Sequence, residues 1–524
     1  MQFNKFKNLL IPVFLVVLVI FTRFLFLNWG NNNFFNPDEN NMATSVAQMT
    51  PSNLNPKFFA YGQFPLFLTF FTTPSHNFSS IVLTMRFWSA IFSSLSILFF
   101  YLISQDIFKS KKISYIFVLL LTFTPGLIQS AHFGTTESIL IFVFSANIYL
   151  SLKYYQNQKK QYILFAILTS AIGFSSKITA IFLILPIYFS LLFIYLKDKK
   201  FLNLIFTFFI FNLLFLLLSL LFSPFNIIDF SNFKSAISYE SSVATGNLNV
   251  FYTRQFENSL PYLFQFYKIF PYTNGVFIFF FSFVGFFFFL KSYFINHKSK
   301  LILITIIPSI IYFLYAGQLF VKWSRFMSPL FFIGPLFCLY IFKKIRNIYL
   351  IIILLIIMIS PGLFFFNGYF FSDTRVVASN WIKSNISSES YLLSESGNVV
   401  NLPISYPDLN VNNFDFYQLD SAPNNLEKLA NILTTIDYIL IPSRRVFKNQ
   451  NNPKYPLSQK YYQNLFSENI GFTEVKKFTN QKDLFLNSEN AEETWSVFDN
   501  PTIRIYKKIN NLAPDDYQEL LSNN

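Results

Sequence analysis

The chain contains eleven apolar blocks, each close to the length that crosses a lipid bilayer as a helix. About 20 apolar residues in a helix span the roughly 30 Å hydrocarbon core of a bilayer. Hydrophobic residues make up 53% of the 524 residues and charged residues only 13%, which excludes an ordinary soluble or disordered chain. We therefore predict a polytopic α-helical membrane protein, with helices near residues 9–27, 80–104, 113–130, 135–152, 161–176, 178–196, 201–223, 273–290, 301–317, 325–342 and 347–370.

Basic residues cluster before the first block and then in every second connection between blocks. Cytoplasmic loops of membrane proteins carry such an excess of lysine and arginine. The pattern predicts a cytoplasmic N-terminus in a multi-pass protein of the cell membrane, and the odd number of helices places the tail outside. The clusters are Lys5/Lys7, Lys109/Lys111/Lys112, Lys153/Lys159/Lys160, Lys197/Lys199/Lys200, Lys291/Lys298/Lys300 and Lys343/Lys344/Arg346.

The composition changes after about residue 370, where charged residues and short patterned segments replace the apolar blocks. We predict a transmembrane domain over 1–370, with outside loops at 28–80 and 224–272, and an extracytoplasmic α/β domain over 371–524. Alternating helices and strands favour the α/β class. The expected helices are 375–384 and 426–435, and the expected strands are 391–393, 438–442 and 502–506. A packing or docking role is the simplest reading of this domain.

Several functional classes lose support from the same composition. The net charge of +14 is explained by membrane topology, so it does not indicate a nucleic-acid partner. Cys338 is the only cysteine, which excludes a disulfide framework, and the three histidines are scattered. We expect His132 to be a structural histidine. The tail has no glycine-rich phosphate loop, so no nucleotide cofactor is expected.

Ionisable residues in the membrane half gather at the predicted outer face. A charge in a spanning segment costs several kcal/mol unless it is paired or hydrated, so each is a functional candidate. Carboxylates and cations side by side suit sugar transfer from a lipid phosphate, because a carboxylate can accept the acceptor's proton and cations can hold the leaving phosphate. The residues are Arg23, Asp38, Glu39, Lys57, Arg86, Glu137, Lys177, Lys322 and Arg325.

An ordered set of short motifs contains most of these residues. The sequence at these motifs resembles the protein O-mannosyltransferases, and it is also similar to the aminoarabinose transferases that modify lipid A, both of the GT-C class. The resemblance covers roughly residues 1–510. Its motifs are Arg23 followed by Asn36-Pro37-Asp38-Glu39, Lys57 to Pro65-Leu66, Arg86-Phe87-Trp88-Ser89, Thr135-Thr136-Glu137-Ser138, Ser176-Lys177, Lys322-Trp323-Ser324-Arg325-Phe326 to Pro329, and Asn500-Pro501-Thr502.

The resemblance implies a GT-C fold and an inverting transfer of a sugar from a polyprenyl-phosphate donor to an acceptor hydroxyl on a protein, glycan or lipid. It implies catalytic carboxylates at Asp38, Glu39 and Glu137, although the family usually has Asp where this chain has Glu137. The sugar and the acceptor stay open, and so does a divalent cation that carboxylate oxygens would bind. The remaining implied roles are donor-phosphate binding by Lys57, Lys322 and Arg325, and supporting or substrate-loop roles for Arg23, Arg86, Lys177 and Glu240.

Each of these residues also has a purely structural explanation. Asp38 and Glu137 are in positions where an acidic side chain caps a helix. Lys57 can simply face solvent, and Lys322 and Arg325 can reach lipid headgroups. We expect Arg23, Arg86 and Lys177 to pair with carboxylates rather than to contact substrate. Glu240 belongs to the long outside loop, which is predicted to cover the sugar or the acceptor.

Two other functions compete with sugar transfer. A non-enzymatic lipid or polysaccharide transporter, or a flippase, would place charges through the depth of the bilayer to carry a head group across. The charges here gather at one face instead. A polysaccharide ligase or polymerase also uses lipid-linked sugars, but its large outside loop tends to come late, whereas the acidic loop here lies between the first two blocks.

Overall fold

The computed structural model of the chain describes residues 2–295, 300–397, 401–404 and 409–522. Its contacts divide the chain into two compact units. The membrane unit consists of Met1–Leu27, Asp38–Ser242 and Pro261–Phe366, and the α/β unit consists of Asn28–Pro37, Val243–Leu260 and Asn367–Asn524. The α/β unit thus contains two short segments from outside the tail, one before Asp38 and one after Ser242.

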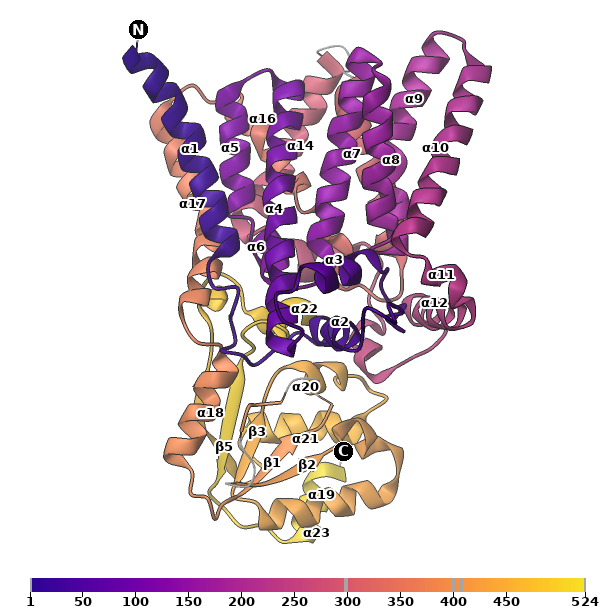
Figure 1. The fold of residues 1–524 in the computed structure, drawn as a ribbon. Helices are drawn as coiled ribbons and strands as arrows, with labels where there is room; N and C mark the ends of the chain where they lie inside the picture. Colours follow the sequence, from indigo (N-terminus) through magenta and orange to yellow (C-terminus); the bar gives the residue numbers. More distant parts are fainter. Residues whose placement is uncertain (1, 296–299, 398–400, 405–408, 523–524) are drawn as a thin grey trace. The chain divides into compact units, whose positions relative to one another are not determined.

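The membrane unit is a bundle of long apolar helices (Figure 1). Each predicted apolar block corresponds to a helix or a pair of helices in the described residues. Among the described residues, seven helices are long and apolar enough to cross a membrane, or nine spans if each of two bent pairs counts as one, and Leu10–Phe24 and Lys160–Phe174 are shorter apolar helices. The elements in order are α1 (Gln2–Phe24), α4 (Phe78–Phe108), α5 (Lys111–Thr122) with α6 (Pro125–His132), α7 (Glu137–Asn157), α8 (Lys160–Phe174), η1 (Ile178–Ile184) with α9 (Leu185–Lys197), α10 (Phe201–Phe222), α14 (Val276–Ile295), α15 (Lys300–Gln318), η4 (Ser324–Leu330) with α16 (Ile333–Phe342), and α17 (Ile348–Asn367).

Shorter helices lie across the end of this bundle that is opposite the N-terminus of the chain (Figure 1). They come from the two loops predicted to lie outside. The first loop forms α2 (Pro37–Ala47) and α3 (Phe64–Thr72), and the long loop forms α11 (Phe225–Ile228), α12 (Phe230–Thr245), η3 (Gln265–Ile269) and α13 (Phe270–Thr273). The long loop also forms η2 (Phe251–Phe256), which belongs to the α/β unit. The long loop is therefore largely helical, whereas the first loop contains two short helices between irregular segments.

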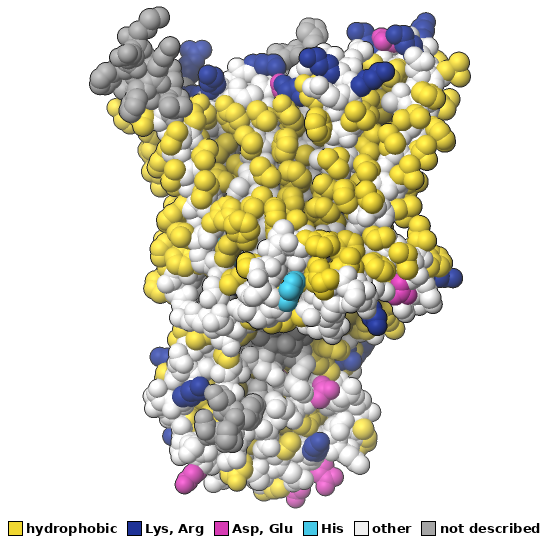
Figure 2. Space-filling view, viewed as in Figure 1, with side chains coloured by type: hydrophobic (Ala, Val, Ile, Leu, Met, Phe, Trp, Pro, Cys, Tyr) yellow, Lys and Arg dark blue, Asp and Glu magenta, His cyan; other side chains and the backbone are white. Residues whose placement is uncertain are grey.

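Figure 2 shows a broad band of hydrophobic side chains around the bundle, with lysine and arginine gathered along one edge of it. That edge includes the turns between α4 and α5, between α7 and α8, and between α9 and α10. Lys109 lies in the first of these turns, Lys153 lies near the end of α7, and Lys197 lies in the last turn of α9. Such a band is what a lipid-facing surface requires, and the chain is a multi-pass membrane protein. The compartment that faces the basic edge stays a prediction, and the predicted cluster residue Lys298 lies outside the described residues.

Two spans are bent where proline begins or enters a helix. The axis turns by 57° between α5 and α6, which begins at Pro125, and by 41° between η4, which contains Pro329, and α16. Proline has no N–H to donate, so the helix is interrupted and carbonyl groups are left without their usual partners. Arg23 fills this gap at the first bend, because its guanidinium donates to the carbonyls of Leu121 and Thr122 at 3.1 and 2.9 Å.

Helix α17 packs directly against this bend through a glycine. A Cβ atom on Gly362 would lie 1.7 Å from the carbonyl oxygen of Phe123, so the backbones approach as closely as glycine permits. We expect Gly362→Ala to destabilise the membrane unit by about 1–3 kcal/mol, because the helix must move away from the bend. The measurement is the apparent melting temperature in detergent. Leu363→Ala is the control, since Leu363 is 40% exposed on the same helix, and equal effects of both changes would contradict the expectation.

The α/β unit is built on a five-stranded sheet with the strand order β2-β1-β3-β5-β4. Strands β1, β2 and β3 run parallel, and β5 and β4 pair antiparallel at the other side of β3. The strands are β1 (Tyr391–Glu395), β2 (Asn410–Phe414), β3 (Tyr438–Ile441), β4 (Phe472–Phe478) and β5 (Ile503–Lys508). The helices are α18 (Thr374–Asn385), α19 (Pro423–Thr435), α20 (Arg445–Asn449), α21 (Pro456–Phe466), α22 (Glu493–Ser496) and α23 (Pro514–Ser522), with short turns η5 (Gly368–Phe370), η6 (Phe416–Ser421), η7 (Gln481–Leu484) and η8 (Ser488–Asn490).

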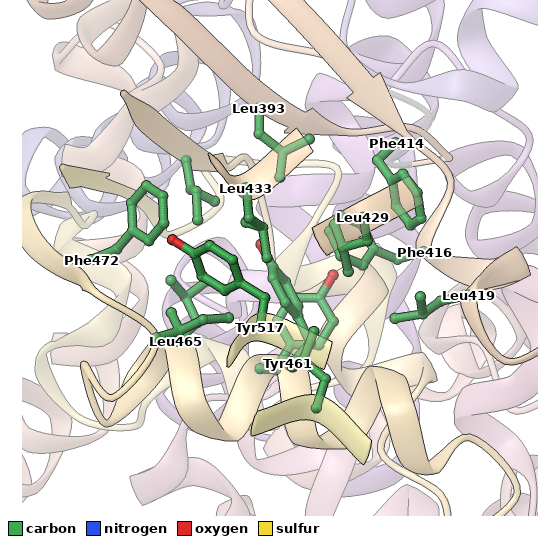
Figure 3. Packing of buried hydrophobic residues seen from close by; sticks show 14 of the residues in the cluster. Leu393, Phe414, Phe416, Leu419, Leu429, Leu433, Tyr461, Leu465, Phe472 and Tyr517 are labelled. Carbon is green, nitrogen blue, oxygen red and sulfur yellow. The ribbon is translucent and has the colours of Figure 1, made fainter. Parts of the chain in front are cut away.

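Both faces of this sheet are buried. Leu393 of β1 and Ile439 of β3 pack against α19, α21 and α23, where Tyr461 and Tyr517 fill the cluster shown in Figure 3. The alternate residues Leu392 and Leu440 point to the opposite face, where they pack with Ala378 and Ile382 of α18. Alternation along each strand thus serves two cores, and the α/β class predicted for the tail is confirmed.

Candidate functional site

A fully buried ion pair fixes α2 to the membrane bundle. The Arg86 guanidinium donates from Nε and Nη2 to the two carboxylate oxygens of Glu39, at 2.7 and 2.6 Å, and both side chains have no exposed surface. The backbone N–H of Gly134 donates to the same carboxylate at 2.7 Å. Glu39 therefore joins α2, α4 and the turn before α7, and this geometry favours a supporting role over direct chemistry.

Asp38, the neighbouring residue of α2, points elsewhere and forms an ion pair with Arg325 at the start of η4. Both side chains keep some exposed surface, 20% for Asp38 and 15% for Arg325. The Arg325 guanidinium also lies over the Trp323 ring, with 4.3 Å between the charge centre and the ring centroid. The structure thus brings together a carboxylate and a cation predicted from distant parts of the sequence, and leaves both accessible.

Asp38 with Arg325 is the first acidic group. The second acidic group, Glu137 with Lys177, lies at the N-terminus of α7. The Lys177 ammonium is 3.8 Å from Oε1 of Glu137 and lies over the rings of Tyr61 and Phe326, 5.3 and 4.9 Å from their centroids. Glu137 and Lys177 are only 8% and 12% exposed. Because Phe326 follows Arg325 directly, η4 contributes to both acidic groups. The structure therefore joins Glu137 and Lys177 to the same region as Asp38 and Arg325.

Electrostatic coupling extends this second group to the long loop. Burial lowers the pKa of Lys177, while Glu137 and Glu240 act in the opposite direction. Partial desolvation raises the pKa of the Glu240 carboxyl on α12, and Lys177 opposes that change. Burial, together with the charges of Glu137 and Glu240, raises the pKa of Tyr61 well above its usual range. Glu240 is thus electrostatically part of this group, although it lies in the exposed α12.

Tyr61 and Phe326 complete the group and did not stand out as single residues in the sequence. The backbone brings Tyr61 there through Gly62, where an added Cβ would lie 2.0 Å from the carbonyl oxygen of Ser175. Two hydrogen bonds, Gly62 N–H to Ser176 O at 2.9 Å and Phe64 N–H to Ser175 O at 3.0 Å, hold the loop against the Lys177 turn. A glycine beside an aromatic residue in the first loop was the available signal.

Three of the predicted cations form contacts other than these two ion pairs. Lys57 is exposed and has a positive φ of 49°, and its charge contributes to lowering the pKa of Asp229. Lys322 is buried and donates to the carbonyl oxygen of Phe320 at 2.9 Å. Arg23 was expected to pair with a carboxylate, and that expectation is wrong. Its hydrogen-bond partners are neutral oxygens, namely Ser93 Oγ and Thr22 Oγ1 as well as the two carbonyls at the bend.

Within the described residues, no group of three His, Cys, Asp or Glu side chains is arranged to hold a metal ion. His132 has its two ring nitrogens 2.9 Å from the carbonyl oxygens of Ile128 and Leu25, as expected for a structural histidine. Three carboxylates were considered as cation ligands, Asp38, Glu39 and Glu137. Asp38 and Glu39 are held by different arginines, and Glu137 lies 3.8 Å from the Lys177 ammonium.

The pKa of Lys322 predicts a measurable pH dependence of donor binding. Burial lowers the pKa of its ammonium to about 8. The group is charged below that pH and neutral above it. If Lys322 binds a donor phosphate, kcat/KM for the donor falls as the pH rises through about 8, because this parameter reports groups of the free enzyme. Lys322→Arg keeps its charge and should move the fall to higher pH. An unchanged profile in that variant would remove Lys322 from donor binding.

Known proteins resemble this chain in sequence and in fold. Residues 65–227 match the family model described as dolichyl-phosphate-mannose-protein mannosyltransferase. Among solved structures, the apo oligosaccharyltransferase of Archaeoglobus fulgidus is similar, with a TM-score of 0.54 and 14% identity over 88% of this chain and 73% of that one. The chain has the GT-C fold. No curated protein matches it.

Other GT-C structures are also similar. The apo structure of ArnT from Cupriavidus metallidurans has 11% identity over 83% of this chain and 92% of that one, with a TM-score of 0.49. The part of the GT-C chain that matches the family model contains Arg86, Glu137 and Lys177, and it ends before Glu240 and Arg325. The family match and the fold confirm the resemblance stated from the motifs.

Proposed function

We propose that the protein transfers a sugar from a polyprenyl-phosphate donor to an acceptor hydroxyl at the end of the bundle where α2 and η4 meet. The observation that carries the proposal is the accessible ion pair of Asp38 and Arg325. These are a general base and a phosphate-binding cation within reach of one another, which is what a direct displacement at the sugar carbon requires. We place this end of the bundle on the outer face of the cell membrane.

In the proposed reaction the acceptor oxygen attacks the anomeric carbon as the bond from that carbon to the phosphate oxygen breaks. Asp38 takes the proton from the acceptor hydroxyl. The polyprenyl phosphate leaves with the bonding electron pair, and Arg325 stabilises the charge that develops on it through its planar guanidinium. Attack from the side opposite the leaving phosphate inverts the sugar carbon. Glu137 and Lys177 would orient the sugar hydroxyls or the acceptor beside the rings of Tyr61 and Phe326.

A lipid-linked donor is supported by an apolar cavity of about 360 Å³ between α14, α15 and α16. Phenylalanine side chains dominate its lining, among them Phe266, Phe279, Phe283, Phe313 and Phe337. An isoprenoid chain offers the branched apolar surface that such a cavity accommodates. The description of the matching family, which names dolichyl-phosphate-mannose, agrees with a donor of this class.

The first experiment uses the purified protein in lipid nanodiscs with a panel of polyprenyl-monophosphate sugars. Release of polyprenyl phosphate is measured with membrane and cell-envelope extracts supplied as acceptor. We expect release from one sugar donor or a few. In parallel, vesicles containing the protein and fluorescent polyprenyl-phosphate sugars report movement between leaflets. Movement without release from any donor would replace the proposal with a lipid transporter.

A further inference from the structure

The α/β unit holds a segment of the long loop, residues 249–257, through several side-chain contacts. The Arg254 guanidinium donates to Gln450 Oε1 at 2.8 Å and lies over the Tyr455 ring, 4.4 Å from its centroid. The next residue, Gln255, accepts from Arg444 Nη2 at 2.9 Å. Further contacts are made by Glu257, which accepts from Asn452 at 3.0 Å and from Lys454 at 3.3 Å, and by Phe251, whose ring centroid is 4.9 Å from that of Tyr417.

Residues 249–257 are held at the part of the sheet where ligands bind in many α/β proteins. In open α/β sheets, ligands bind beyond the carboxyl ends of parallel strands, at the point where the strand order reverses. That point lies between β1 and β3 here, because β2 follows on one side of β1 and β3 on the other. Arg444 and α20 directly follow the carboxyl end of β3 at Ile441. The chain's own segment 249–257 therefore occupies the edge of the sheet where a ligand would usually bind.

The same unit holds a second segment, residues 28–37. The Phe35 ring lies under the Arg375 guanidinium, 3.8 Å from its charge centre, and Arg375 is in turn paired with Asp373 at 2.7 Å. The Trp29 and Tyr369 rings are 6.4 Å apart between centroids. Phe35 and Trp29 are 3% and 6% exposed, so these two buried side chains anchor the segment to the unit.

Each of the two held segments, residues 28–37 and 249–257, is close in the chain to a candidate acidic residue. Asp38 directly follows Pro37, the last residue of the first segment. Helix α12 carries Glu240 and ends at Thr245, just before the second segment begins. We infer that the α/β unit positions both acidic loops for the transfer reaction, with Arg254 and Phe35 as positioning residues. This inference rests on the proposed function and gives the tail a role in catalysis beyond packing.

The test compares Arg254→Ala with Arg254→Lys and with a control, Arg504→Gln. Arg504 lies in the same unit, where its ion-pair partners are Glu489 at 2.5 Å and Glu474 at 3.5 Å. In Arg254→Ala we expect faster hydrogen exchange over residues 230–260 and a loss of transfer on the order of 10²-fold, which a displacement near 1 Å produces. Arg254→Lys keeps the cation over the aromatic rings and should recover much of both.

The control variant should lower the melting temperature while exchange over 230–260 and transfer below that temperature stay normal. A second variant, Phe35→Ala, should speed exchange around residues 28–47 and reduce transfer in the same way. Normal exchange in Arg254→Ala and Phe35→Ala would show that these residues do not hold the two segments in place, and would overturn the inference. Faster exchange with unchanged transfer would overturn the positioning role. Because hydrogen exchange needs no substrate, absence of transfer in the wild type counts against the proposed function alone.

Discussion

The Asp38→Asn variant should fold normally and lose sugar transfer by about 10²–10⁴-fold, the usual contribution of a general base. Asparagine has nearly the shape of aspartate and can still accept a hydrogen bond from Arg325, but it cannot take the acceptor's proton. The measurement is release of polyprenyl phosphate from the donor that the wild type uses, under saturating donor and acceptor. Donor affinity should change little, because the phosphate partner Arg325 is retained.

The matched control for this variant is Asp229→Asn. Asp229 is an acidic residue of the same unit, it accepts hydrogen bonds from Asn55 and Asn232, and it lies outside both acidic groups. We expect that change to leave transfer unaltered. Transfer by Asp38→Asn at the wild-type rate would remove the general-base role and direct attention to Glu137 as the base.

The second large effect is expected at the Glu39–Arg86 pair. Removing one partner leaves an uncompensated charge in a fully buried position, which typically costs about 3–5 kcal/mol. Glu39→Gln and Arg86→Met should therefore each lower the apparent melting temperature and the yield of folded protein. The double variant should recover part of that loss, because neither charge then remains. A thermodynamic cycle over the four proteins in detergent measures the coupling.

A pair whose cation is exposed provides the comparison. Lys109 is 68% exposed and lies 3.7 Å from Asp106, so Lys109→Met should have an effect below about 1 kcal/mol. If Glu39→Gln kept full stability but abolished transfer, Glu39 would act in the chemistry itself, as the sequence had suggested beside a supporting role. The two sets of variants thus distinguish the supporting role of the fully buried Glu39 from the catalytic role of the accessible Asp38.

The helices of the membrane unit were predictable because a bilayer imposes one length and one composition on every span. The α5–α6 block shows the limit of that argument, since residues 113–130 form one apolar block but two helices that meet at 57°. Hydropathy does not register the bend at Pro125. The arginine that satisfies the carbonyls of this bend was expected to seek a carboxylate, because sequence shows charge but not backbone groups that have lost their partners.

In the tail, the strands found from sequence are β1, β3 and β5, which lie inside the sheet. Strands β2 and β4 were missed, and both lie at its edges. The β2 sequence Asn410–Phe414 is rich in asparagine, and most of β4 is exposed between Phe472 and Phe478. An edge strand needs little apolar alternation, because one side has no neighbouring strand and charged residues protect it from pairing. Its sequence therefore looks like that of a loop.

The candidate site was predictable as a set of residue types and not as pairs. Nothing in the spacing of Asp38 and Arg325 indicates that they meet, since 287 positions separate them. Asp38 and Glu39 are neighbours in the chain, but in a helix adjacent side chains point about 100° apart, so one is sealed against Arg86 and the other faces Arg325. Only the three-dimensional structure separates the two roles.

The composition of the α/β unit from three segments has a consequence for biosynthesis. Residues 28–37 and 243–260 are made long before residues 367–524, with which they pack. While the ribosome is still adding the last spans, the aromatic side chains of these early segments have no interior to enter. The membrane bundle can assemble span by span, but the loops beside Asp38 and Glu240 reach their final conformation only when synthesis of the chain is nearly complete. A protein truncated near residue 366 should therefore insert and pack its helices while remaining catalytically immature.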